Sequence, residues 1–162
     1  MLEQFSKSPS LLSVTDYEEH IWMLQLQQPE QVNRRFNLWK VNQGLDIQLL
    51  IKAIQDIIKT TPDLNVRYTF SDEGDLYKYP FDDHSACLEL KKSNTEQVFE
   101  QVATLKAQAW NAEFHPPFLT NLIETEQDYF LILALHPILD ESYQKSDFIQ
   151  AIQNRYQQHL LL

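Results

Sequence analysis

Hydrophobic residues recur along the chain with two different periods, and these periods mark out the predicted helices and strands. From 46 to 59 apolar residues lie three or four positions apart, which predicts an amphipathic helix with Asp46 as its N-cap. Thr15 and Glu18 have the spacing of a capping box, so a shorter helix is predicted to begin there. From 34 to 41 apolar residues occupy both faces of an alternating pattern, which predicts a strand buried on much of both sides.

Further segments have the short period of strands. Residues 64–70 and 75–81 flank a turn at Gly74 and predict a hairpin. The stretch 118–135 is interrupted by polar residues at 126–128, which divides it into two strands. The second of these strands is almost continuously apolar, so we expect it to be central in its sheet.

The predicted elements alternate between helix and strand through the second half as well. A short strand is predicted over 84–90, with Cys87 on its apolar face. Ser93 and Glu96 have the spacing of a second capping box, predicting a long helix that ends near Trp110. A terminal helix follows over 147–160. The pattern therefore predicts an α/β fold, a two-layer sandwich with a mixed sheet.

Composition narrows the class of protein further. The 162 residues suit one domain over 1–162, and the formal charge of −10 with no basic run argues against nucleic acid as a partner. Gly44 and Gly74 are the only glycines, too few for a dinucleotide fingerprint or a phosphate-binding loop. Cys87 is the only cysteine, and no apolar run is long enough to span a membrane. We expect a cytoplasmic protein without a metal site and without membrane contact.

The stretch "LALHPILDES" is the main candidate for chemistry. His136 comes directly after the predicted central strand, and Asp140 follows four residues later. A strand that runs into a loop and then a helix is a common way to present a histidine at the edge of a cleft.

Three stretches together resemble the N-terminal half of a nonribosomal peptide synthetase condensation domain, in the chloramphenicol-acetyltransferase-like superfamily. "VTDYEEHIWMLQL" is similar to the opening helix motif of that family, and "LNVRYTF" is similar to its Leu-Arg-Thr-x-Phe motif, with Arg67 on the arginine. "LHPILDES" resembles the active-site motif His-His-x-x-x-Asp-Gly, with His136 on the second histidine and Asp140 on the aspartate. The resemblance covers essentially the whole chain.

The resemblance implies a role for each matched residue. His136 would be the catalytic residue, which either accepts the proton of the attacking amine or orients the amine by a hydrogen bond. Asp140 would form a buried structural pair with Arg67 and hold the loop in shape. No cofactor would be bound by the chain itself, since phosphopantetheine would arrive on a carrier protein.

The motif also departs from the family pattern, at the first histidine, which is Leu135 here, and at the glycine, which is Glu141. Pro137 follows the catalytic position. A side chain in place of glycine blocks close backbone approach, so we expect altered or lost activity. The second half that completes the active-site cleft in the family is not part of this sequence.

Three interpretations follow. The chain is a noncatalytic or degenerate partner that binds a carrier protein or another synthetase component; this is the interpretation we favour. Alternatively, it is an acyl or aminoacyl transferase that forms an amide bond from a carrier-bound thioester, with a site completed by self-association as a homo-oligomer. His136 would then be the base or the group that positions the nucleophile. As a third possibility, it is a fragment of a larger synthetase.

Overall fold

The computed structural model of the protein describes residues 11–29, 35–108, 115–140 and 145–161. The helices are α1 (Asp16–Gln27), α2 (Ile47–Thr60), α3 (Thr95–Ala107) and α4 (Lys145–Leu160). The strands are β1 (Leu12–Ser13), β2 (Arg35–Lys40), β3 (Val66–Phe70), β4 (Leu76–Pro80), β5 (Leu88–Lys92), β6 (Phe118–Glu124) and β7 (Tyr129–Leu135). Short 3₁₀ helices lie at η2 (Pro62–Asn65), η3 (Ser85–Cys87) and η4 (Pro137–Leu139).

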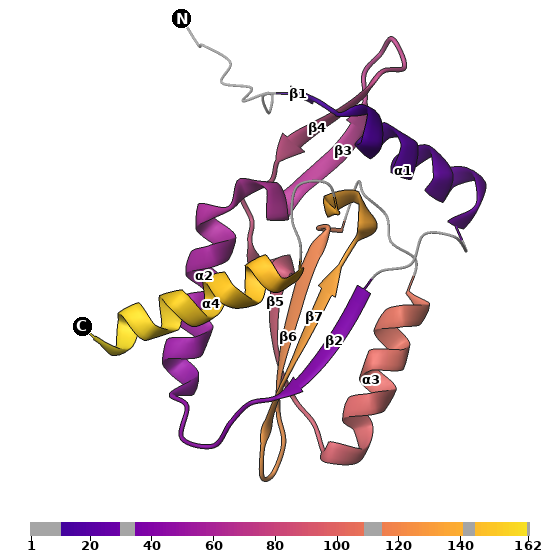
Figure 1. The fold of residues 1–162 in the computed structure, drawn as a ribbon. Helices are drawn as coiled ribbons and strands as arrows, with labels where there is room; N and C mark the ends of the chain where they lie inside the picture. The colour runs from indigo at the N-terminus through magenta and orange to yellow at the C-terminus, as the bar shows by residue number, and fades with distance from the viewer. Residues whose placement is uncertain (1–10, 30–34, 109–114, 141–144, 162) are drawn as a thin grey trace, which may run out of the picture.

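The larger sheet has the strand order β2-β7-β6-β5. β5 runs parallel to β6, whereas the β2–β7 and β6–β7 pairs are antiparallel, so the predicted mixed sheet is confirmed. Helices α2 and α4 cover one face of this sheet and α3 covers the other (Figure 1). The predicted central position of the last strand is confirmed, because β7 lies between β2 and β6.

The two covered faces explain why β7 is apolar at successive positions. Leu131 and Leu133 belong to the core shared with α2 and α4, whereas Ile132 packs in the smaller core beneath α3. Side chains alternate between the faces of a strand, so a strand covered on both sides needs apolar residues at both sets of positions. β2 divides in the same way, with Trp39 on the α2 and α4 side and Phe36 on the α3 side.

The predicted hairpin forms a separate sheet of three strands, in the order β1-β4-β3. Gly74 lies in its turn at φ +88°, a conformation that side chains with a Cβ rarely adopt. Helix α1 packs against this sheet through Trp22, whose ring centroid lies 5.8 Å from that of Tyr68. The predicted capping box is present at its start, since Thr15 accepts from the Glu18 amide and Glu18 accepts from the Thr15 amide.

Some predicted boundaries differ from the structure. The N-cap of α3 is Asn94 rather than Ser93, because the Asn94 side chain accepts the Gln97 amide. The α3 helix ends at Ala107, and Trp110 lies outside the described residues. The strand predicted over 84–90 begins only at Leu88, after the η3 turn. No helix in the described ranges has the length and apolar character to cross a membrane.

Candidate functional site

His136 lies at the junction between β7 and η4. Its backbone amide donates to the Pro117 carbonyl at 2.8 Å, which ties the end of β7 to the segment that leads into β6. Its backbone is extended, with φ −80° and ψ 140°, and Pro137 begins η4 immediately afterwards. The side chain folds back onto the protein, and His136 is only 1% exposed.

Both nitrogens of the His136 imidazole are hydrogen bonded. Nδ1 lies 3.1 Å from the Ile138 backbone amide, and Nε2 lies 2.9 Å from Gln25 Oε1. A backbone amide only donates, so Nδ1 is the unprotonated acceptor. In the neutral ring the proton is therefore on Nε2, which donates it to the Gln25 oxygen. This assignment fixes one tautomer of His136 from its surroundings.

Gln25 comes from α1, which is fastened to the same loop. Tyr17, also in α1, donates its hydroxyl to the Pro137 carbonyl at 2.8 Å. Sequence reasoning did not identify Gln25 as a site residue. It lies four positions after Ile21 and three after Trp22, which are buried on the inner side of the helix. A polar residue at that spacing faces the same side, and this is the signal that could have identified it.

The other end of α1 is held by Glu18. Its carboxylate accepts from the Tyr68 hydroxyl at 2.6 Å and from Lys78 Nζ at 2.9 Å. Burial acts to raise the pKa of Glu18, but the hydrogen bonds from Tyr68, Lys78 and the Thr15 amide outweigh it, so the pKa is lowered. Glu18 therefore joins the small sheet to the helix that carries Gln25.

The structure does not bring together the expected pair of Asp140 and Arg67. Asp140 forms its ion pair with Arg35, at 2.8 Å between Oδ2 and Nη2. The two side chains are partly exposed, at 27% for Asp140 and 58% for Arg35. Partial burial raises the pKa of the Asp140 carboxyl, and the Arg35 guanidinium acts in the opposite direction. The aspartate thus anchors the loop to the start of β2 rather than to β3.

Arg67 is buried at 1% exposure and has different partners. Its Nη1 donates to Asn65 Oδ1 at 2.6 Å, and its guanidinium carbon lies 4.3 Å from the centroid of the Phe81 ring. Burial lowers the pKa of the guanidinium, and the Cys87 thiol and nearby Tyr79 oppose this change.

Asn65 was also missed from the sequence. The side-chain amide of Asn65 donates to the backbone carbonyls of Phe81 and Asp83, both at 2.8 Å. These two hydrogen bonds hold the segment after β4 next to Arg67. An asparagine between a proline-led turn and a strand is a frequent hydrogen-bonding position, which is the signal available.

Leu135 and Glu141 are two further positions at which the sequence departs from the family motif. Leu135 is buried at 4% exposure, so a hydrophobic contact occupies the place of the first histidine of the motif. Glu141, expected to alter the loop, lies outside the described residues. Within the described ranges, no three or more His, Cys, Asp or Glu side chains are grouped to hold a metal ion.

No family model and no curated protein matches the sequence. Solved structures do match its fold. The starter condensation domain of rhizomide synthetase RzmA aligns with a TM-score of 0.67 and 17% identity, over 88% of this chain and 38% of that one. The chain has a condensation-domain-like fold.

Two other solved structures agree. The tallysomycin biosynthesis protein TlmII aligns with a TM-score of 0.72 and 15% identity, over 90% of this chain and 38% of that one. The complex of the X-domain and OxyB from teicoplanin biosynthesis aligns with a TM-score of 0.73 and 16% identity, over 91% of this chain and 33% of that one. The condensation-like chain thus spans about a third of the length of the structures that it matches. The predicted recognition and fold class are confirmed at the level of the fold.

Proposed function

We propose that this chain is a noncatalytic condensation-like half-domain of nonribosomal peptide biosynthesis, which acts in the cytoplasm by binding a carrier protein or another synthetase component. The observation that carries the proposal is the enclosed state of His136. The condensation-domain-like fold supports the biosynthetic setting.

A general base must have a free lone pair within reach of the proton that it removes. In His136 the only unprotonated nitrogen, Nδ1, accepts from the Ile138 amide, and Nε2 already carries a proton. Its 1% exposure leaves no surface on which an amine could approach. Catalysis would require Gln25 to move away and the ring to change its tautomer or its orientation.

The proposal is tested first at the histidine. Diethyl pyrocarbonate modifies accessible neutral imidazoles, and mass spectrometry identifies the modified residue. We expect His136 to remain unmodified in the folded protein and to react in urea, whereas the exposed His20 and His115 react in both conditions. Rapid modification of His136 in the folded state would contradict the enclosed site.

The second test concerns activity and binding. Carrier proteins loaded with aminoacyl-pantetheine thioesters are mixed with the chain, and amide products are followed by mass spectrometry. We expect no product above that of His136→Ala, together with saturable binding of a carrier or synthetase protein in calorimetry. Product formation that disappears in His136→Ala at an unchanged melting temperature would establish the acyltransferase interpretation instead. Absence of binding to every loaded carrier and synthetase component would overturn the proposed function.

A further inference from the structure

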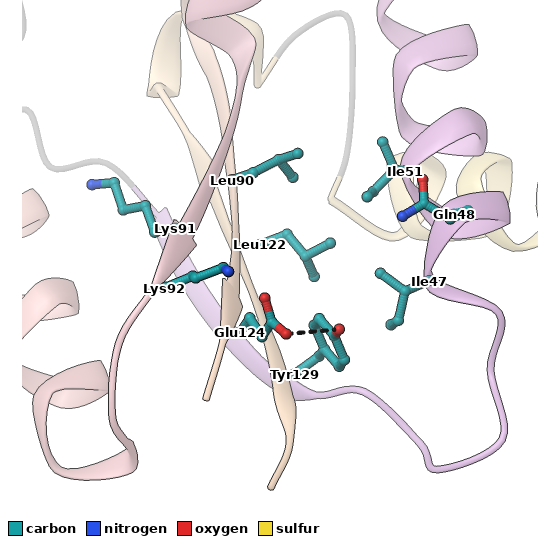
Figure 2. A pocket seen from close by; sticks show the side chains of 9 residues that line it. All are labelled: Ile47, Gln48, Ile51, Leu90, Lys91, Lys92, Leu122, Glu124 and Tyr129. Carbon is teal, nitrogen blue, oxygen red and sulfur yellow. Dashed lines mark hydrogen bonds between the residues drawn. The ribbon is translucent and has the colours of Figure 1, made fainter. Parts of the chain in front are cut away.

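A groove runs between α2 and the edge strand β5, on the face of the sheet opposite α3. It contains two hollows of about 230 Å³ each. The first is lined by Ile47, Gln48, Ile51, Leu90, Lys91, Lys92, Leu122, Glu124 and Tyr129 (Figure 2). The second is lined by Gln55, Ile58, Lys59, His84, Ser85, Leu88 and Leu90. We call this feature the α2–β5 groove.

The two hollows are successive positions along one strand. Leu90 borders both, Leu88 borders the second, and Lys92 borders the first. These residues are two apart in β5, so they lie on one face of the strand. Two residues of a strand span about 6.6 Å, which is also the spacing of alternate side chains in any extended peptide.

The outer edge of β5 has backbone groups available for pairing. Among the described strands only β6 is hydrogen bonded to β5, through the parallel register from Leu88 to Lys92. In a parallel pair, alternate residues direct their amide and carbonyl groups away from the neighbouring strand. Leu90, at the middle of this edge, is 58% exposed and borders both hollows.

The charge of the groove is opposite to that of the chain. Lys59 stands at one end and Lys92 at the other, and neither forms an ion pair with a described carboxylate. Glu124 faces the first hollow and accepts the Tyr129 hydroxyl at 3.3 Å (Figure 2). Lys91 points away from the hollow in Figure 2 and pairs with Glu89. The groove therefore has two unpaired cations against one acid, in a protein with a formal charge of −10.

We propose that the α2–β5 groove binds an extended segment of a partner protein, which adds to the sheet along β5. The segment places apolar side chains from alternate positions into the two hollows and acidic side chains beside Lys59 and Lys92. This inference deepens the proposed function and rests on it, since it names the kind of partner segment that the half-domain binds.

A second copy of the chain fits the groove less well. Antiparallel pairing of two β5 strands about Leu90 would place Lys92 of each copy opposite Leu88 of the other. Leu88 borders the hollow that also contains Lys59. On the face of the sheet that forms the groove, the dimer would therefore bring like charges together at both ends, which an acidic segment avoids.

The test uses the whole chain and a panel of short fluorescent peptides, acidic at both ends, with Val, Leu, Ile or Phe in turn at two alternate central positions. We expect saturable binding of one or more peptides. On binding, the β5 amides should gain protection from hydrogen exchange. A matching panel with lysine at both ends, and one with proline between the apolar positions, should not bind. The proposal would be overturned if the lysine-ended peptides bound as well as the acidic ones. It would also be overturned if a peptide bound without protecting the β5 amides from hydrogen exchange.

Variants locate the site. Leu90→Glu places a charge between the hollows at an exposed position, and we expect it to weaken binding by about tenfold or more. Lys59→Glu should weaken binding by about threefold, as for an exposed charge pair. Lys52→Glu is the matched control, because Lys52 is an exposed lysine of α2 that lines neither hollow, and it should bind as the parent does. If Lys52→Glu and Lys59→Glu weakened peptide binding equally, the loss would reflect the net charge of the chain rather than a contact in the groove. That result would contradict the assignment.

The remaining outcomes separate the two proposals. If no peptide of the panel binds, while a carrier or synthetase protein binds the parent and Leu90→Glu equally, the groove assignment fails and the proposed function stands. If light scattering shows a dimer that Leu90→Glu converts to a monomer, the occupant is a second copy, which also overturns the assignment. Catalytic turnover at His136 would overturn the proposed function without changing the peptide result.

Discussion

The Nε2 of His136 donates a hydrogen bond to Gln25 across 111 residues of sequence, at 2.9 Å. The contact joins the end of the central strand to the opening helix. Because the Ile138 amide holds the other ring nitrogen, the imidazole is fixed in orientation and tautomer. The histidine that the motif marks as catalytic therefore connects two parts of the fold.

The first prediction concerns this tautomer. At neutral pH the ¹⁵N spectrum of His136 should show an unprotonated Nδ1 and a protonated Nε2, because Nδ1 accepts a backbone amide. Long-range ¹H–¹⁵N correlation of labelled protein measures it, with the exposed His20 as an internal comparison. A protonated Nδ1 in the folded protein would disprove the hydrogen-bonding scheme.

Removal of the acceptor should destabilise the fold. In Gln25→Ala the buried Nε2–H of His136 loses the Gln25 acceptor, which we expect to cost about 1–3 kcal/mol in urea unfolding. Gln27→Ala, at an exposed position of the same helix, is the control and should change stability by less than about 0.5 kcal/mol. Equal effects of the two substitutions would mean that the contact adds nothing beyond helix propensity.

The ion pair of Asp140 gives a prediction by double-mutant cycle. Arg35 and Asp140 are partly exposed, so alanine substitutions should give a coupling of about 0.2–1 kcal/mol that decreases with added salt. Arg67 and Asp140 have separate partners, so their substitutions should be additive within about 0.5 kcal/mol. A larger coupling for the Arg67 cycle would restore the pairing expected from the family motif.

Glu18 should contribute to the dependence of stability on pH. Its pKa in the folded protein lies below the ordinary 4.5. The unfolded chain therefore takes up the proton first as the pH falls. The stabilisation is complete above the unfolded pKa and is lost as the pH falls through the folded pKa.

The Glu18→Gln variant provides the measurement. Loss of the charged acceptor of Tyr68 and Lys78 should cost about 1.5–3 kcal/mol at pH 7. Urea unfolding of parent and variant from pH 7 to pH 3 should show this difference shrinking with acidity. Glu19→Gln, an exposed position in the same turn, is the control. A difference that stays constant down to pH 3 would rule out the titration.

Cys87 should be unreactive in the folded protein. Burial raises the pKa of its thiol to about 12, although nearby Arg67 acts to lower it, and the residue is 0% exposed. Since a thiolate is the reactive form, Ellman's reagent at pH 8 should label the chain only as fast as it unfolds. The chain has one cysteine, so the signal has one source. Prompt labelling without urea would contradict this burial.

Much of the fold could be predicted because the relevant information is local. The α2 helix was predicted from the Asp46 cap and the recurrence of isoleucine and leucine, and β7 was predicted as central from apolar residues on both faces. The N-cap of α3 was predicted one residue too early. Ser93 and Asn94 are both favourable N-cap residues. The backbone amide of Ser93 still donates to the Glu124 carbonyl of β6, so the helix begins only after Asn94.

The sequence by itself determined helices α1 to α4, the strands apart from β1, the mixed character of the larger sheet and the position of His136 after the central strand. The pairing of β1 with the hairpin in a separate sheet was decided by the tertiary structure. The partners of the site residues were decided only by the tertiary structure. The register of β2 on β7 sets Arg35 opposite Leu135, which brings Arg35 to the loop that contains Asp140. Periodicity and capping depend on neighbours within about four residues, whereas a side-chain partner depends on which distant segments the packing brings together.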